Sequence, residues 1–196
     1  MTINFYSKES IVARACEAAF GRPLVVNNLR ALLVEAMIES ALLQPEWRWS
    51  AADWAGWDFE HQDGTRLEVK QSAAKQSWSM SPKRSSSPRF DIAERTGYWE
   101  GGVTWVPLRA RHAHLYVFAY HPIADDTADH RDPSQWQFYV LPTVDLPALK
   151  TVSLRYVSQM GEPARIGDLG RAVDAAKSRL PAPQLQSRDD AVPAGK

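Results

Sequence analysis

The sequence predicts an α/β domain of three layers, in which a central mixed β-sheet is flanked by helices. Three observations predict this class: two helical segments open the chain, a polar hairpin follows them, and two aromatic strands and a last helix come later. The chain of 196 residues has the length of one domain, and its 44% hydrophobic residues are typical of a folded protein. We expect a single domain over residues 1–180 and a disordered tail, rich in Pro, Ala and Gln, over residues 181–196.

The composition excludes several classes of protein. Cys16 is the only cysteine, so one chain can build neither a disulfide framework nor a cysteine-based zinc site. Charged residues interrupt any signal-peptide core near the start, and no apolar run approaches the roughly 20 residues of a membrane span. We therefore expect a cytoplasmic protein with no membrane association. The 23 basic and 23 acidic residues cancel, so any contact with DNA would be local.

The first helix is expected over residues 8–20, after the N-cap candidate Ser7 and before Gly21. The second is expected over residues 28–43, before Pro45. Nearly every position of the second helix is apolar, which predicts that it is buried on most sides.

Two carboxylates interrupt this apolar second helix. Glu35 and Glu39 are four residues apart and so lie on one helix face. A buried carboxylate is costly unless it is paired, protonated or bound to metal, so we expect one of the two to face a polar site. The alternative is that both lie on a narrow solvent-exposed stripe.

The segment WDFEHQDGTRLEVKQS predicts a hairpin with strands over residues 54–61 and 66–72. A three-residue loop with Gly64 in the left-handed conformation would pair His61 with Thr65. In this register the apolar and charged side chains separate onto opposite faces. The apolar face would hold Trp57, Phe59, Leu67 and Val69. The polar face would hold Asp58, Glu60, Arg66, Glu68 and Lys70.

The same register places Asp58 opposite Glu68, with Lys70 one step further along the polar face. Two facing carboxylates repel each other unless a cation lies between them. Carboxylate oxygens suit Mg²⁺, for which Mn²⁺ could substitute, and a neighbouring lysine can orient a water and offset developing charge. The pattern favours phosphodiester hydrolysis. The alternative is that Arg66 and Lys70 only neutralise the carboxylates of a solvated strand face.

A serine-rich basic stretch over residues 77–89 predicts a mobile loop. The side chains expected to contact nucleic-acid phosphates are Lys75, Lys83, Arg84 and Arg89, with a merely solvated loop as the alternative. Trp78 and Trp99 flank this loop, and we favour core packing for both over stacking on nucleic acid.

Two further strands are expected over residues 114–121 and 136–142, which are rich in β-branched and aromatic residues. The acidic loop between them, with its neighbouring histidines, matches no metal-ligand spacing. A last helical pattern covers residues 168–180.

A glutamate in an early helix, then an aspartate, a turn and Glu-Val-Lys in the next strand resemble the PD-(D/E)xK superfamily of nucleases. In this chain they are Glu35, Asp58 and Glu68-Val69-Lys70. The longer match LEVKQSAAKQSW is similar to a subgroup of small restriction-endonuclease-like bacterial proteins, and the resemblance covers roughly residues 29–143. Trp57 stands where the family name has proline, and the Gln-x-x-x-Tyr element of RecB-like nucleases is missing.

The resemblance implies a restriction-endonuclease-like core and a Mg²⁺-dependent DNA endonuclease. The metal ligands that it implies are Asp58, Glu68, the Val69 carbonyl and, directly or through water, Glu35. It further implies that Lys70 positions the attacking water and that Gln76 touches a phosphate or that water. A restriction enzyme would also be a homodimer, because cutting both strands of a symmetric site takes two active sites. The alternatives are a noncatalytic DNA-binding or assembly module with the same fold, and a nuclease acting on RNA.

Overall fold

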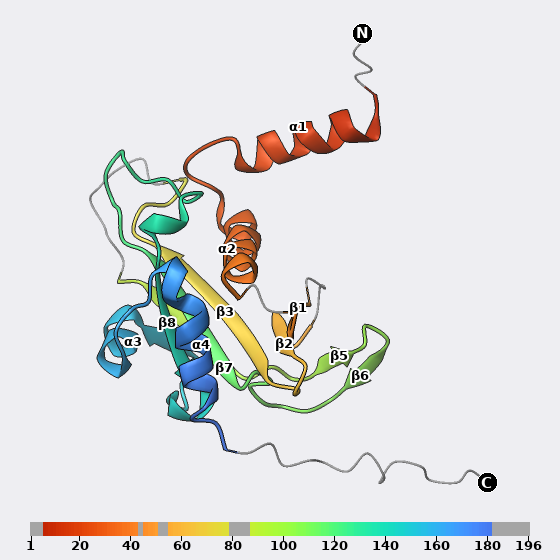
Figure 1. Ribbon diagram of the computed structural model, residues 1–196, viewed down its shortest axis with the longest axis vertical. Helices are drawn as coiled ribbons and strands as arrows, with labels where there is room; N and C mark the ends of the chain where they lie inside the picture. Colours follow the sequence, from red (N-terminus) through yellow and green to blue (C-terminus); the bar gives the residue numbers. More distant parts are fainter. Residues whose placement is uncertain (1–5, 43–44, 51–54, 79–86, 182–196) are drawn as a thin grey trace, which may run out of the picture.

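The computed structural model describes residues 6–42, 45–50, 55–78 and 87–181, and these contain α-helices, β-strands and short 3-10 helices (Figure 1). The α-helices are α1 (Lys8–Phe20), α2 (Asn27–Leu42), α3 (Leu154–Met160) and α4 (Leu169–Lys177). The strands are β1 (Trp47–Trp49), β2 (Phe59–His61), β3 (Arg66–Ala73), β4 (Arg89–Asp91), β5 (Tyr98–Glu100), β6 (Thr104–Val106), β7 (Leu115–His121), β8 (Gln137–Pro142) and β9 (Thr151–Ser153). The 3-10 helices are η1 (Pro133–Gln135), η2 (Thr143–Asp145) and η3 (Ile166–Asp168).

The main sheet has five strands in the order β1-β2-β3-β7-β8, so the hairpin strand β3 lies at its centre. β3 and β7 run parallel, whereas the other neighbouring strands run antiparallel. This arrangement confirms the expected central mixed sheet. Two small antiparallel sheets accompany it, one formed by β4 and β9 and the other by β5 and β6.

The two faces of the main sheet bury separate hydrophobic cores, because successive side chains of β3 and β7 point to opposite sides. The first core contains Leu67 and Val69 of β3 and is covered by α2 and α4. The second core contains Tyr116 and Phe118 of β7, with side chains from β4, β5, β9 and α3. Helices therefore lie on both faces, and the expected three-layer α/β class is confirmed (Figure 1).

The hairpin between β2 and β3 has the expected three-residue loop. The His61 amide donates to the Thr65 carbonyl at 2.8 Å, and Phe59 pairs with Leu67. Gly64 has φ +84°, the left-handed conformation that the loop needs. The register that separates apolar from charged side chains is therefore confirmed from Phe59 onward.

Trp57 is the exception, and its expected position on the apolar face with Phe59 is wrong. Phe59 belongs to the first core, whereas Trp57 packs in the second core against Tyr98, with ring centroids 5.2 Å apart. Strand pairing begins only at Phe59, so the alternation of a regular strand does not extend back to Trp57.

The remaining expectations differ from the structure mainly at their boundaries. α1 has the expected limits, and its N-cap Ser7 accepts a hydrogen bond from the Ser10 amide. The strand expected over residues 54–61 is shortened to β2. Of the loop expected over residues 77–89, residues 79–86 lie outside the described residues, and its last residue, Arg89, begins β4. Lys83, Arg84 and nearly all of the expected tail lie outside the described residues. Within the described residues, no helix combines the length and apolar character needed to cross a membrane.

Gly64 gives a first test of the hairpin. Gly64→Ala should lower the free energy of unfolding by about 1 kcal/mol, because a Cβ is disfavoured at positive φ even where it meets no neighbouring atom. Gly161→Ala is the matched control: this glycine has extended backbone and equally open space, so its substitution should be nearly neutral. If both substitutions changed the free energy of unfolding in urea by the same amount, the positive φ of Gly64 would not be the cause of the loss.

Candidate functional site

β2 begins only at Phe59 because the preceding residue, Asp58, offers β3 a side-chain oxygen where a longer strand would offer a backbone carbonyl. The Asp58 amide donates to the Leu67 carbonyl at 3.0 Å, while its carboxylate Oδ2 accepts from the Val69 amide at 2.6 Å. In an antiparallel ladder the N–H and C=O of one residue face the same neighbouring strand. The Val69 carbonyl is therefore on the β3 edge that Asp58 faces, where β2 no longer pairs.

Glu68 and Lys70 lie on the opposite face of β3 from Val69, beside the second core. Their partners on β7 are Tyr116 and Phe118, both of which are second-core residues. The Lys70 ammonium and the Glu68 carboxylate form a direct, mostly buried ion pair. The strand thus places one carboxylate and one cation next to Asp58.

Glu35 brings a third carboxylate from α2. Its Oε2 accepts a hydrogen bond from the Trp49 indole at 3.0 Å, so β1 holds the side chain in place. Glu35 is near enough for its charge to raise the pKa of Asp58. Glu39, the other carboxylate of this helix, is exposed to solvent. Of the two, Glu35 is therefore the one that lies near the polar face of the hairpin.

The charges at this place are not balanced. Glu60 forms an ion pair with Arg48 at 2.6 Å, and Glu68 pairs with Lys70. Among the residues that the structure describes, no cation forms an ion pair with Asp58 or Glu35. Simple neutralisation of a strand face therefore accounts for Glu60 and Glu68 but not for Asp58. When ionised, the three carboxylates Glu35, Asp58 and Glu68 exceed the single ammonium of Lys70 by two negative charges.

The pKa values of these carboxyls reflect that imbalance. Burial, followed by the charges of Glu68 and Glu35, raises the pKa of Asp58 to about 8. Burial also raises the pKa of Glu35, with the charge of Glu68 adding to it and the Trp49 hydrogen bond opposing it. Without a further cation, Asp58 therefore resists ionisation at neutral pH.

The donors near Asp58 are oxygen atoms, the ligand type that Mg²⁺ takes in proteins. Within the described ranges, no three His, Cys, Asp or Glu side chains converge closely enough to hold an ion. Magnesium is usually bound through one or two carboxylates and keeps several waters, whereas structural zinc takes four protein ligands. Asp58, Glu68 and the Val69 carbonyl offer oxygen donors of the kind that Mg²⁺ accepts.

Gln76 is held by a buried arginine that sequence reasoning missed. Arg30 of α2 has only 1% of its surface exposed and donates to the side-chain oxygens of Gln71, Gln76 and Asn27 at 2.7–2.9 Å. The Gln76 amide nitrogen in turn donates to the Ala73 carbonyl. Both the oxygen and the nitrogen of the Gln76 side chain are thus hydrogen-bonded within the protein, so Gln76 links Arg30 of α2 to the end of β3. The available signal was a lone arginine in an otherwise apolar helix segment.

The described members of the expected phosphate-contacting group point to different places. The Lys75 ammonium bonds the Asp125 carbonyl and the Asp126 carboxylate at 2.8 and 2.7 Å, so it ties the acidic loop to the end of β3. Arg89 is exposed at the start of β4, where its guanidinium approaches the Thr151 hydroxyl at 3.4 Å. The structure does not bring these two side chains together.

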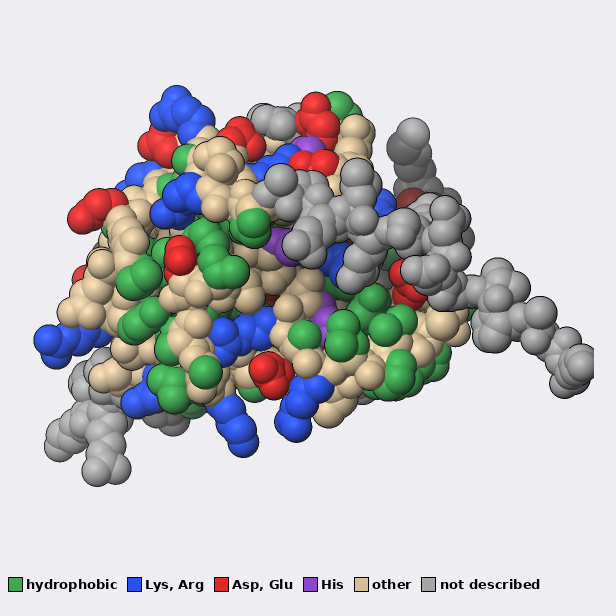
Figure 2. Space-filling model, turned by 90° about the horizontal axis from the view of Figure 1, so that it is seen from below, with side chains coloured by type: hydrophobic (Ala, Val, Ile, Leu, Met, Phe, Trp, Pro, Cys, Tyr) green, Lys and Arg blue, Asp and Glu red, His purple; other side chains and the backbone are tan. Residues whose placement is uncertain are grey.

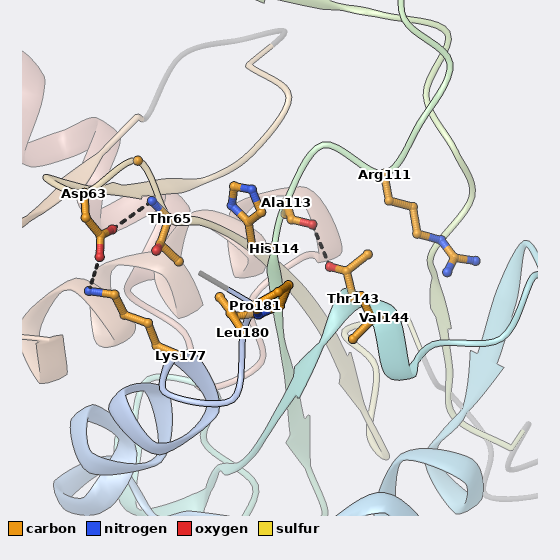
Figure 3. Close-up of a pocket in the computed structure, with 11 residues that line it drawn as sticks. Asp63, Thr65, Arg111, Ala113, His114, Thr143, Val144, Lys177, Leu180 and Pro181 are labelled. Atoms are coloured by element: carbon orange, nitrogen blue, oxygen red, sulfur yellow. Dashed lines mark hydrogen bonds and ion pairs between the residues drawn. The ribbon is translucent and has the colours of Figure 1, made fainter. Parts of the chain in front are cut away.

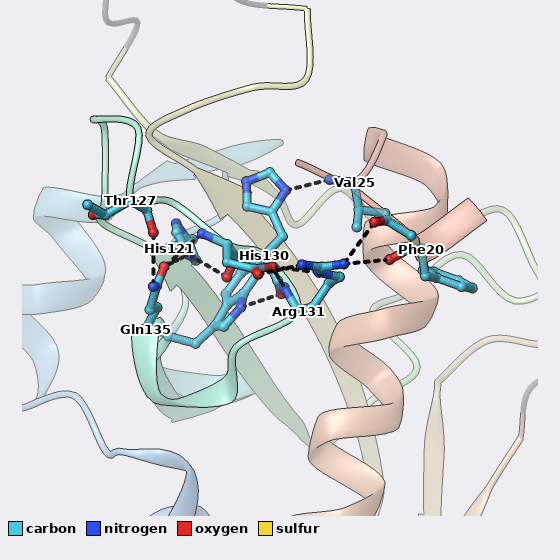
Figure 4. A network of polar contacts seen from close by, with 10 residues as sticks. Phe20, Val25, His121, Thr127, His130, Arg131 and Gln135 are labelled. Carbon is cyan, nitrogen blue, oxygen red and sulfur yellow. Dashed lines mark hydrogen bonds and ion pairs between the residues drawn. The ribbon is translucent and has the colours of Figure 1, made fainter. Parts of the chain in front are cut away.

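His121, the last residue of β7, and His130, in the loop that follows, belong to a structural network (Figure 4). His130 accepts from the Val25 amide at 3.0 Å, and its other ring nitrogen lies 3.1 Å from the Lys75 carbonyl. Arg131 donates to the carbonyls of Phe20 and Gly21, at the end of α1. This network fastens the connection between α1 and α2 to the sheet.

A separate cavity of about 330 Å³ lies between the hairpin loop, the start of β7 and the end of α4 (Figure 3). Its charged groups are already engaged: Lys177 pairs with Asp63 at 2.7 Å, and Arg111 donates to backbone carbonyls. The residues of the candidate site do not line this cavity. The unpaired carboxylate therefore lies at the site around Asp58 and not in this cavity.

Comparison with known proteins adds no family to this geometry: neither a family model nor a curated protein matches the chain.

The raised pKa of Asp58 predicts how stability depends on pH. An acid whose pKa is higher in the folded protein than in the unfolded chain favours folding in its protonated form, so the metal-free protein should lose stability as the pH rises from about 4 to about 8. Asp58→Asn removes the charge and keeps an oxygen for the Val69 amide. In EDTA at pH 8 it should raise the free energy of unfolding by roughly 2 kcal/mol, which is about 4–8 °C in Tm.

The control for this experiment is Glu60→Gln, whose carboxylate is already paired with Arg48 and should change Tm little. The gain from Asp58→Asn should shrink toward pH 4, where the wild-type carboxyl is protonated in the folded state. A variant less stable than the wild type at pH 8 would show that Asp58 is not an uncompensated charge.

Proposed function

We propose that this chain is a metal-dependent phosphodiesterase that cleaves DNA, with Mg²⁺ as the resident ion and Mn²⁺ as a substitute. The observation that carries the proposal is the unbalanced charge just before β2 begins: Asp58 faces Val69 beside Glu68 and Lys70, and no described cation forms an ion pair with it. The similarity of Glu35, Asp58 and Glu68-Val69-Lys70 to the PD-(D/E)xK nucleases supports the same conclusion. In this proposal the chain takes the restriction-endonuclease-like form of the α/β fold.

A divalent ion would be held by Asp58, Glu68 and the Val69 carbonyl, with Glu35 bonding it through water. When bound, such an ion polarises the phosphate and offsets the charge that develops on it during hydrolysis. Two excess negative charges on Glu35, Asp58, Glu68 and Lys70 favour a doubly charged cation, because each carboxylate is otherwise buried at a cost.

Lys70, held in place by Glu68, would act on the attacking water and on the phosphate. The Lys70 ammonium is fixed by Glu68, so a water or a nonbridging phosphate oxygen on that face would meet a preoriented donor. Water would attack the phosphorus in line with the leaving oxygen, so that one P–O bond forms as the P–O bond to the leaving sugar oxygen breaks. Lys70 would orient that water and stabilise the added negative charge, and the proton released by the water would pass through solvent to the leaving oxygen. Arg30, which bonds Gln71 next to Lys70, would keep this end of β3 rigid.

One active site suffices to nick one strand of a duplex. The proposal therefore expects a monomer to convert supercoiled plasmid to the open circular form. A homodimer would bring two sites together, and linear product would then accumulate with the open circle.

Plasmid cleavage in Mg²⁺, Mn²⁺ and EDTA tests the proposal. Asp58→Asn and Lys70→Ala should each slow nicking by about a hundredfold or more, since each removes a group that acts on the reacting phosphate. Glu60→Gln is the matched control on the same hairpin and should retain wild-type nicking. Calorimetry gives a second readout: Mg²⁺ should raise the Tm of the wild type but not that of Asp58→Asn.

Two results would contradict the proposal. Nicking that survives in EDTA, or that Asp58→Asn leaves unchanged, would remove the metal from the reaction. Tight DNA binding without cleavage in either metal would instead favour the noncatalytic module. A parallel assay on RNA of the same sequence distinguishes a ribonuclease, which would cleave the transcript and leave the plasmid intact.

A further inference from the structure

The hairpin of β5 and β6 presents two tryptophans to solvent. Trp99 and Trp105 are cross-strand partners, 40% and 43% exposed, and their ring centroids are 5.7 Å apart. Val103 follows Gly101 and Gly102 at the tip of the hairpin, directly before β6, and is 81% exposed. The expectation that Trp78 and Trp99 pack in the core is therefore wrong for both, since Trp78 is 63% exposed. Figure 2 views the molecule from the end where this hairpin lies and shows hydrophobic side chains gathered there with Lys and Arg beside them.

The exposed ring pair is held rigidly from beneath. Tyr98, one residue before Trp99, points inward and is a second-core residue. Gly97 allows the Trp105 ring to lie against the backbone, because an added Cβ there would be 2.5 Å from a ring atom. Rings that are already fixed lose little conformational freedom when a ligand stacks on them. The exposed faces of the Trp99 and Trp105 rings can therefore bind a ligand at a small cost in conformational entropy.

The hairpin is joined to the candidate site by a chain of packed aromatic and guanidinium groups. Tyr98 packs against Trp57, which directly precedes Asp58. The Arg66 guanidinium lies 3.6 Å from the centre of the Trp57 ring, at the start of the strand that carries Glu68 and Lys70. Arg95 and Arg109, near the base of the hairpin, add exposed guanidinium groups that pair with the Asp91 and Glu94 carboxylates at 3.0 and 3.6 Å. A polymer in the site could thus extend onto the tryptophans.

The area of the pair argues against a stable protein partner. At 40% and 43% exposure, two tryptophans of at most about 250 Å² each offer about 200 Å² together. A specific protein interface needs about 800 Å² from each partner. Base stacking needs only the face of a ring, so two exposed rings suffice for two bases.

We infer that Trp99 and Trp105 form a stacking platform for unpaired nucleic-acid bases next to the candidate site. The inference rests on the proposed function and narrows its substrate: the preferred nucleic acid carries a single-stranded or splayed segment beside the cleaved phosphodiester. Bases of an intact duplex are stacked on one another and expose no face to the platform.

Fluorescence anisotropy in EDTA tests the platform apart from cleavage. The probes are a labelled DNA strand of about 20 nucleotides and the duplex of the same sequence. Trp99→Ala and Trp105→Ala should each weaken binding of the strand about tenfold, and the double variant about a hundredfold. The duplex should lose less than about threefold. Trp99→Phe, which keeps an aromatic face, should recover most of the affinity.

Val103→Ala is the matched control, since it removes exposed apolar surface from the same hairpin without removing a ring, and it should bind the strand like the wild type. Equal strand binding by the wild type and the double variant, with unchanged Tm, would overturn the inference. So would an effect of Val103→Ala as large as that of the tryptophan variants, or a change in oligomeric state in place of binding. Because no metal is present, a failure of the nicking assay leaves these outcomes unaffected.

Discussion

The hydrogen bond from the Val69 amide to the Asp58 carboxylate is the contact on which the candidate site depends. If β2 extended further toward the N-terminus, the Val69 amide would donate to a β2 backbone carbonyl. The Asp58 carboxylate accepts from it instead, so β2 begins only at Phe59 while β3 continues to Ala73. Because pairing with β2 begins only at Phe59, Trp57 turns into the second core and β2 leaves the β3 edge unpaired at Val69. The backbone pairing of the hairpin and the packing of Trp57 thus both depend on this one side chain.

The cost of this arrangement is electrostatic. A buried carboxylate that bonds one amide and no cation is stable only when protonated or when another positive charge arrives. Arg48 forms an ion pair with Glu60, and Lys70 forms one with Glu68. The Arg30 guanidinium donates to three side-chain amide oxygens. These cations are therefore paired with other groups, and none of them forms an ion pair with Asp58.

Local signals in the sequence were enough for the fold class and the hairpin. Ser7 marks the start of α1, and Gly64 fixes the loop that sets the β2-β3 register. Long-range contacts were not predictable in the same way. Gln76 is engaged by Arg30, 46 residues away, and this pairing leaves no periodic trace. The three-residue strands β4, β5, β6 and β9 are too short for an alternation to be recognised, and with them the outward position of Trp99 was missed.

α1 differs from the other three described α-helices in how it is supported. It buries none of its 13 residues, and Figure 1 shows it projecting from the body of the molecule. Isolated helices of this length are marginal in water, so its hydrogen bonds open by local helix–coil fluctuation. Amides of β3 and β7, shielded on both faces, open only when the domain unfolds. One chain therefore contains two regimes of amide exchange, separated at the carbonyls of Phe20 and Gly21, where Arg131 holds the helix end.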